Sequence, residues 1–130
     1  MLTLDLPPPG APPPAVVTLA FRPPAQAGDE TAYLAALDRV GEIATPFGLL
    51  VVLGAGLALS RDGERAQAMW FKATRQTLEA RCLAMAVVRP VVTPRMVETF
   101  GRLWSMPLHF TTDEADAARW LRARLAGGAQ

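Results

Sequence analysis

Two runs of consecutive apolar residues, Leu49–Leu53 and Leu83–Val88, constrain the fold of this chain more than any other feature. Each run has the length of one strand and offers no polar side chain to water, as is typical of strands covered on both faces of a sheet. Helical patterns alternate with these strands, and the connections are short. The pattern predicts one α/β domain over residues 1–130, with a mixed, mostly parallel sheet of about five strands and about four helices.

The first 21 residues predict two strands joined by a proline-rich connector. Apolar and polar residues alternate from Leu2 to Leu6, and Val16–Phe21 reads as a second strand. Residues 7–14 contain six prolines, which exclude helix and central strand. We expect residues 7–14 to form a hairpin or an extended connector. A ligand for a proline-binding domain is the alternative.

Three of the four predicted helices have a start signal in the sequence. Asp29 is the expected N-cap of a helix over residues 30–44, and a helix over residues 64–81 follows a loop at 54–63. Thr93 with Pro94 opens the third helix. The fourth is expected to start at a capping box of Thr111 and Glu114 and to stop at Gly127. The third helix should bury an inner face of Met96, Val97, Phe100, Leu103 and Trp104.

Composition and charge exclude several classes of function. The net charge is +1, and Lys and Arg do not cluster, so nucleic-acid binding is not expected. The longest apolar run, Phe47–Leu59, is shorter than the roughly twenty residues of a membrane span. The N-terminus does not resemble a secretory signal, and the one cysteine suits a reducing compartment. We therefore expect a soluble, cytoplasmic protein.

No residue pattern predicts catalysis, a metal or a cofactor. Gly54 and Gly56 follow a strand, but a dinucleotide-binding loop would need a third glycine where Leu59 stands. His109 is the only histidine, and alternation turns it away from its neighbours in a short strand. Cys82 borders a buried strand, so the two are not expected to form a nucleophile–base pair.

Three large apolar neighbours, Met69, Trp70 and Phe71, stand out on the second predicted helix. Successive helix residues point about 100° apart, so one sheet-facing stripe cannot cover all three. Either the helix is clamped between the sheet and another helix, or one of these side chains stays exposed. In the second case they form a binding surface for a partner protein or an apolar ligand, and the simplest partner is a second copy in a homodimer.

Short motifs in three places resemble one known family. The chain is similar to the SpoIIAA-like branch of the STAS domains (sulphate transporter and anti-sigma-factor antagonist). The resemblance spans residues 16–125 and rests on Ala86-Val87-Val88, on Phe110 with Ala117 and Trp120-Leu121, and on Gly28-Asp29-Glu30 with Tyr33. It implies a mixed sheet with helices largely on one side and a non-enzymatic regulatory or binding role.

Anti-sigma-factor antagonists of this family carry a phosphorylated serine at the start of the helix after a central strand. Ser60 lies in that region, within Leu59–Gly63, although the surrounding residues differ from the family motif. The leading hypothesis is a STAS-like binding or regulatory module acting through protein or apolar-ligand contacts. The alternatives are a regulator switched by phosphorylation of Ser60 and an enzyme of unrecognised type.

Overall fold

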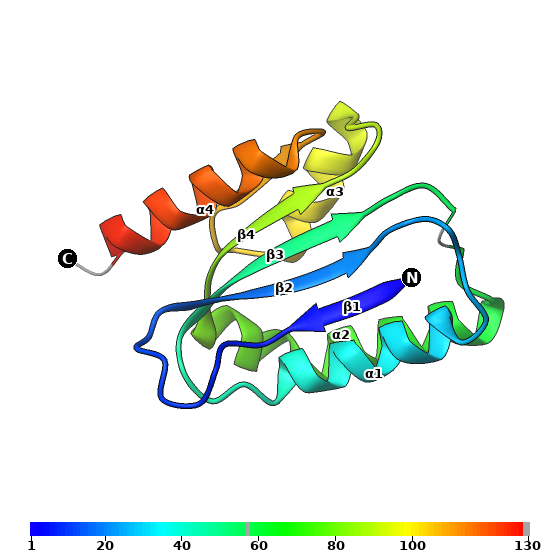
Figure 1. The fold of residues 1–130 in the computed structure, drawn as a ribbon, viewed down its shortest axis with the longest axis horizontal. Coiled ribbons are helices and arrows are strands. Elements are labelled where there is room, and N and C mark those ends of the chain that lie inside the picture. The colour runs from blue at the N-terminus through cyan, green and yellow to red at the C-terminus, as the bar shows by residue number, and fades with distance from the viewer. Residues whose placement is uncertain (57, 129–130) are drawn as a thin grey trace.

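Strands and helices alternate along most of the chain (Figure 1). The computed structural model describes residues 1–56 and 58–128. The elements are β1 (Leu2–Asp5), β2 (Ala15–Phe21), α1 (Asp29–Gly41), β3 (Phe47–Leu53), α2 (Arg61–Arg81), β4 (Cys82–Val88), α3 (Pro94–Leu103), β5 (Leu108–Thr111) and α4 (Glu114–Gly128).

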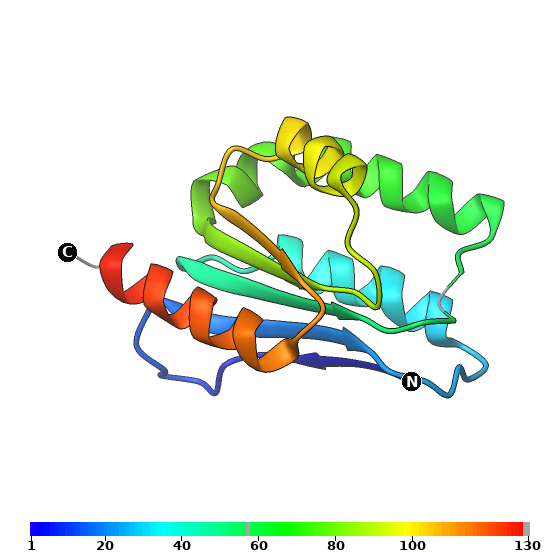
Figure 2. The same ribbon diagram turned by 90° about the horizontal axis from the view of Figure 1, so that it is seen from above.

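The five strands form one sheet in the order β1-β2-β3-β4-β5. β1 is antiparallel to β2, and all other neighbours are parallel. Because strand order follows chain order and parallel crossovers share one hand, the three crossover helices lie on the same face. Figure 2 shows α1, α2 and α3 on that face and α4 on the other. The predicted mixed, mostly parallel α/β sheet is confirmed.

Alternation along the strands divides the core into two parts. On β3, Leu49 joins the buried cluster that contains Leu78 of α2, whereas Leu50 and Val52 pack with Leu121 and other residues of α4. The aligned register places Leu49 beside Met85 and Leu50 beside Ala86, so the same division continues on β4. Helices therefore pack on both faces of the central strands, as their continuous apolar sequences predict, and the exception is Leu83 at the start of β4, which is 38% exposed.

The proline-rich residues 7–14 connect the antiparallel strands β1 and β2. Leu2 pairs with Phe21 and Leu4 pairs with Leu19, so β1 extends the sheet at one edge. In Figure 1 this connector lies at the end of the sheet where β2 starts, away from the loops that follow β3 and β4.

Asp29 does not cap α1, so that prediction is wrong. Gly28 precedes the helix with φ 90°, and no side chain caps it. The Asp29 carboxylate instead accepts hydrogen bonds from the backbone N–H groups of Gln26, at 2.6 Å, and Leu2, at 3.1 Å. These hydrogen bonds, chiefly that of Gln26, lower the pKa of Asp29. The residue therefore ties the start of α1 to β1. The helix ends at Gly41, before the predicted Ala44.

Two further helix starts differ from the predictions. α2 begins at Arg61, three residues early, because Ser60 accepts a hydrogen bond from the Gly63 N–H at 3.1 Å. α4 begins at Glu114, and Asp113 caps it by accepting from the N–H groups of Ala115 and Asp116. Thr111 is instead the last residue of β5, so the predicted capping box does not form.

The ends of α3 and α4 give one confirmation and two corrections. Thr93 caps α3 by accepting from the Met96 N–H at 3.2 Å, with Pro94 in the first turn as predicted. Val97, expected on the inner face of α3, is 44% exposed. α4 continues through Gly127, the expected stop, to Gly128.

None of the helices in the described part of the chain is both long and apolar enough to cross a membrane.

Candidate functional site

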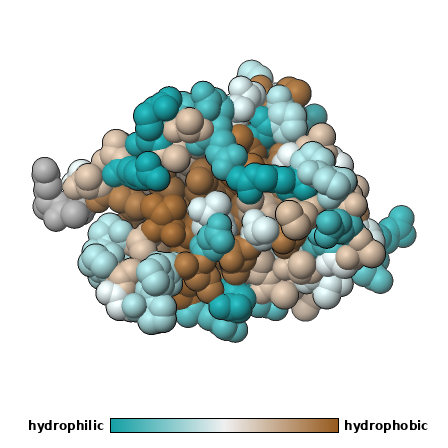
Figure 3. Space-filling model, in the orientation of Figure 1, coloured by the Kyte–Doolittle hydropathy of each residue, from teal (hydrophilic) through white to brown (hydrophobic). Residues whose placement is uncertain are grey.

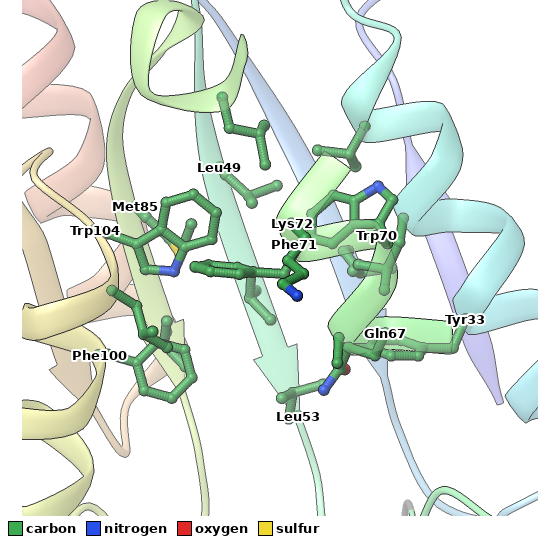
Figure 4. Close-up of a pocket in the computed structure, with 18 of the residues that line it drawn as sticks. Tyr33, Leu49, Leu53, Gln67, Trp70, Phe71, Lys72, Met85, Phe100 and Trp104 are labelled. Carbon is green, nitrogen blue, oxygen red and sulfur yellow. The ribbon is translucent and has the colours of Figure 1, made fainter. Parts of the chain in front are cut away.

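A cavity of about 820 Å³ lies between the sheet and the helices α1, α2 and α3 (Figure 4). Leu49, Val51 and Leu53 of β3 form its floor, together with Met85 and Val87 of β4. Small-molecule sites in proteins commonly measure about 300–1,000 Å³ and are mostly apolar. The cavity therefore has the size and lining of a site for a small molecule.

The packing of α2 explains why this space exists. At its C-terminal end Leu78 is buried against the sheet, but farther towards its start α2 packs on α1. Gly63 and Gly41 permit this close approach. A Cβ on Gly63 would lie 2.5 Å from Glu30 Oε1, and one on Gly41 would lie 3.0 Å from Thr74 Cγ2. Because α2 is drawn towards α1, the space between α2, α3 and the sheet stays open.

Aromatic side chains form the wall of the cavity beneath α2. Phe71 points towards α3 and meets Trp104, with ring centroids 4.9 Å apart and ring planes at 76° (Figure 4). Trp70 lies on the side of α1, where its Nε1 faces the backbone of Gly41 and has no hydrogen-bond partner among the described residues. The guanidinium of Arg75 lies over the Phe71 ring at 5.8 Å and also pairs with Glu79 at 3.6 Å.

Four polar residues, Tyr33, Arg65, Gln67 and Lys72, are among the described residues that line the cavity. The Tyr33 hydroxyl donates a hydrogen bond to Gln67 Oε1 at 2.6 Å, which links α1 to α2. Burial raises the pKa of Tyr33, and the positive charge of Arg89 partly opposes this rise. The hydroxyl therefore stays protonated and remains a hydrogen-bond donor at neutral pH.

α3 closes the remaining side of the cavity only loosely. Its Phe100 and Leu103 are partly buried and line the cavity, but no residue within α3 is fully buried. Phe100 also meets Phe110 of β5, with ring centroids 5.3 Å apart. Only a few large, partly buried side chains therefore pack α3 against the domain. By contrast, α4 fully buries Ala117, Leu121 and Leu125.

The three candidate residues of α2 all line this cavity, but they differ in exposure. Met69 is 71% exposed, whereas Trp70 and Phe71 are half-buried and turned inward. The expectation that at least one of them stays exposed holds for Met69. They do not form one exposed patch. The pattern did not point to Tyr33, Gln67, Phe100 or Trp104 as partners in the site, because these residues come from other elements or from another side of the helix.

Ser60 lies at the start of α2, where its hydroxyl is already engaged. It accepts from the Gly63 N–H and donates to Glu30 Oε2 at 2.9 Å. The Ser60 N–H also donates to the Glu30 carboxylate. The side chain of this proposed phosphorylation site therefore faces a negative charge. Its residue is exposed and lies outside the lining of the cavity.

Cys82 and His109 belong to opposite faces of the sheet. Cys82 packs in the cluster under α2, where burial raises the pKa of its thiol to about 12. His109 stacks on Trp120 of α4, with centroids 5.0 Å apart, and its Nε2 lies 2.9 Å from Asp116 Oδ2. The two side chains therefore do not pair. Among the described residues, no three His, Cys, Asp or Glu side chains are grouped so that they could hold a metal ion.

Comparisons of the chain with models of protein families, with curated proteins and with solved structures find no match.

Proposed function

We propose that this chain is a non-enzymatic binding module that holds an apolar small molecule in the cavity between α2, α3 and the sheet. One observation carries the proposal: a cavity of about 820 Å³ is lined mainly by aliphatic and aromatic side chains. Apolar surface left in contact with water costs about 25 cal/mol per Å². An apolar occupant would remove that surface from water and stabilise the fold through its binding free energy.

The shape of the site favours a small molecule over a flat protein surface. Val51 and Leu53 belong to the central strand β3, yet they are not fully buried, because they line the floor of the cavity. A partner protein reaches Met69, which is 71% exposed at the rim of the cavity, more easily than this floor. A compact or chain-like molecule can occupy the space itself.

Membership of the STAS family and a cytoplasmic location are part of the same proposal. The order of elements and the motifs around Val87 and Trp120 support the family, and the reduced, buried Cys82 suits a reducing compartment. The cavity favours ligand binding over the phosphorylation-switched alternative, because Ser60 lies outside its lining. Its described lining residues also lack a paired nucleophile and base, which an enzyme of acyl-transfer type would need.

Binding of dodecanol tests this proposal. Dodecanol is neutral and largely apolar, and two of the three tryptophans, Trp70 and Trp104, line the cavity. We expect a saturable change in tryptophan fluorescence on titration below the solubility limit of the alcohol. The variant Val51→Phe, which fills part of the cavity, should weaken this binding at least tenfold.

Val91→Phe is the matched control, since Val91 is 65% exposed and lies outside the cavity lining. It should bind dodecanol like the unmodified protein. Circular dichroism establishes that both variants are folded. A folded, unmodified protein without saturable binding would overturn the proposal, as would equal affinities for the two variants.

A further inference from the structure

The polar groups of the cavity point to a particular chemistry of the ligand. We infer, on the basis of the proposed function, that the occupant is a single-chain amphiphile with an acidic head group, of the class of long-chain carboxylates. Its tail would lie over the apolar floor of β3. Its head would meet Gln67 and the positive charges of Arg65 and Lys72.

The charges at the cavity are of one sign. Arg65 and Lys72 line it, and none of the lining residues within the described ranges is Asp or Glu. Neither cation forms an ion pair with another described residue, whereas the neighbouring Arg75 pairs with Glu79. Arg65 and Lys72 are seven residues apart, so they lie two turns apart on the same side of α2. Two uncompensated positive charges beside an apolar space complement an anion attached to an apolar chain.

The amide of Gln67 adds a donor to these charges. Its oxygen already accepts the hydrogen bond from the Tyr33 hydroxyl. Figure 4 shows the Gln67 nitrogen turned away from Tyr33. The amide N–H groups therefore remain to bind a ligand, and they add a third kind of donor to the guanidinium of Arg65 and the ammonium of Lys72 among the lining residues. Such a set binds a carboxylate, which only accepts hydrogen bonds, better than a hydroxyl or an amine.

The floor of the cavity sets the shape of the tail. Leu49, Val51 and Leu53 share one face of β3, and four residue steps along a strand cover about 13 Å. Phe100 bounds this strip on the side of α3, and Trp70 bounds it on the side of α1 (Figure 4). A single unbranched chain matches this strip.

Three ligands with the same tail separate this inference from the proposed function. Dodecanoate and dodecylammonium are titrated below their micelle concentrations, and dodecanol below its solubility limit, at neutral pH. We expect dodecanoate to bind about tenfold more tightly than dodecanol, and dodecylammonium to bind most weakly. Equal affinity for all three would overturn the acidic head group and leave an apolar binding module. Absence of binding for all three would overturn both.

Charge-removing variants assign the head group to its partners. Lys72→Gln and Arg65→Gln should each reduce the ratio of dodecanoate to dodecanol affinity about fivefold, as expected for a partly exposed charge pair. Arg122→Gln is the matched control, because Arg122 is exposed on α4, on the other face of the sheet, and should keep the ratio. A ratio that is unchanged in both test variants would overturn the assignment. So would binding to phosphatidylglycerol vesicles without binding of monomeric dodecanoate.

Discussion

Phe71 of α2 and Trp104, directly after α3, lie edge to face with ring centroids 4.9 Å apart. Trp104 is only 8% exposed and belongs to the core, and both rings line the cavity. The pair connects two helices that otherwise stand apart across the opening between them. The stability of the domain and the shape of the cavity therefore depend on the same contact.

Replacing Phe71 by Ala should destabilise the protein and enlarge the cavity. Aromatic-to-Ala changes in full cores cost about 3–5 kcal/mol, and since Phe71 is only half-buried, we expect about 2 kcal/mol. Urea unfolding measures the change. Met69→Ala, on the same helix at a 71% exposed position, should stay within about 0.5 kcal/mol of the unmodified protein. Equal effects of the two substitutions would contradict the assigned packing of α2.

A negative charge at Ser60 should weaken the contact between α1 and the start of α2. Asp is as good an N-cap as Ser, so Ser60→Asp keeps the cap but places a carboxylate against Glu30. Two like charges about 4 Å apart in water repel by about 1 kcal/mol, and we expect a loss of stability of that size. Thermal unfolding measures it.

Glu30→Gln provides the control for this effect. In that background Ser60→Asp should be nearly neutral, because the repelling charge is gone. A Ser60→Asp protein that is more stable than the unmodified one would contradict the structure here. It would also favour the phosphorylation-switched alternative, in which phosphate at Ser60 is accommodated.

The pair of His109 and Asp116 should make stability depend on pH in the acid range. The hydrogen bond from His109, with a smaller effect from Thr111, lowers the pKa of Asp116 below its ordinary value of 3.8. A lowered pKa in the folded state stabilises the fold above 3.8, and this contribution is lost as the pH falls through the lower folded value. Asp116→Asn should therefore have a lower melting temperature than the unmodified protein near neutral pH.

The difference in melting temperature should shrink when the pH is lowered from about 5 to about 2. Asp38→Asn, at an exposed position on α1, is the matched control for the removal of one carboxylate and should leave the melting temperature near neutral pH nearly unchanged. A difference for Asp116→Asn that is constant over this range would mean that the carboxylate contributes only through its shape.

The sequence predicts an element correctly where the residues of that element alone determine its structure. The continuous apolar residues of β3 and β4 indicated a covered parallel sheet, and Thr93-Pro94 marked the start of α3 correctly. Asp29 and Thr111 were wrong for a common reason. Each is a residue type that commonly caps helices. However, Asp29 accepts a hydrogen bond from the backbone of β1, and β5 continues through Thr111. Whether a polar side chain caps a helix depends on its contacts with residues that are distant in the sequence.

The candidate site was predictable only in part. The width of the apolar arc on α2 indicated that Met69, Trp70 and Phe71 could not all be covered, and Met69 is exposed. The cavity itself depends on how far α2 stands from the sheet. That distance follows from two close contacts: Gly41 of α1 packs on α2, and Gly63 of α2 packs on α1. No periodic pattern in the sequence reveals these contacts. The sequence likewise does not show that Trp104 meets Phe71.

Methyl-selective NMR on the protein with added dodecanol shows which face of β3 the ligand contacts. Leu49 and Val51 line the cavity, whereas Leu50 and Val52, their neighbours on β3, pack against α4. We expect intermolecular contacts and saturable shifts at the methyl groups of Leu49, Val51 and Met85, and none at those of Leu50 and Val52. Contacts confined to Leu50 and Val52, or no contact with either set, would contradict the proposed binding site.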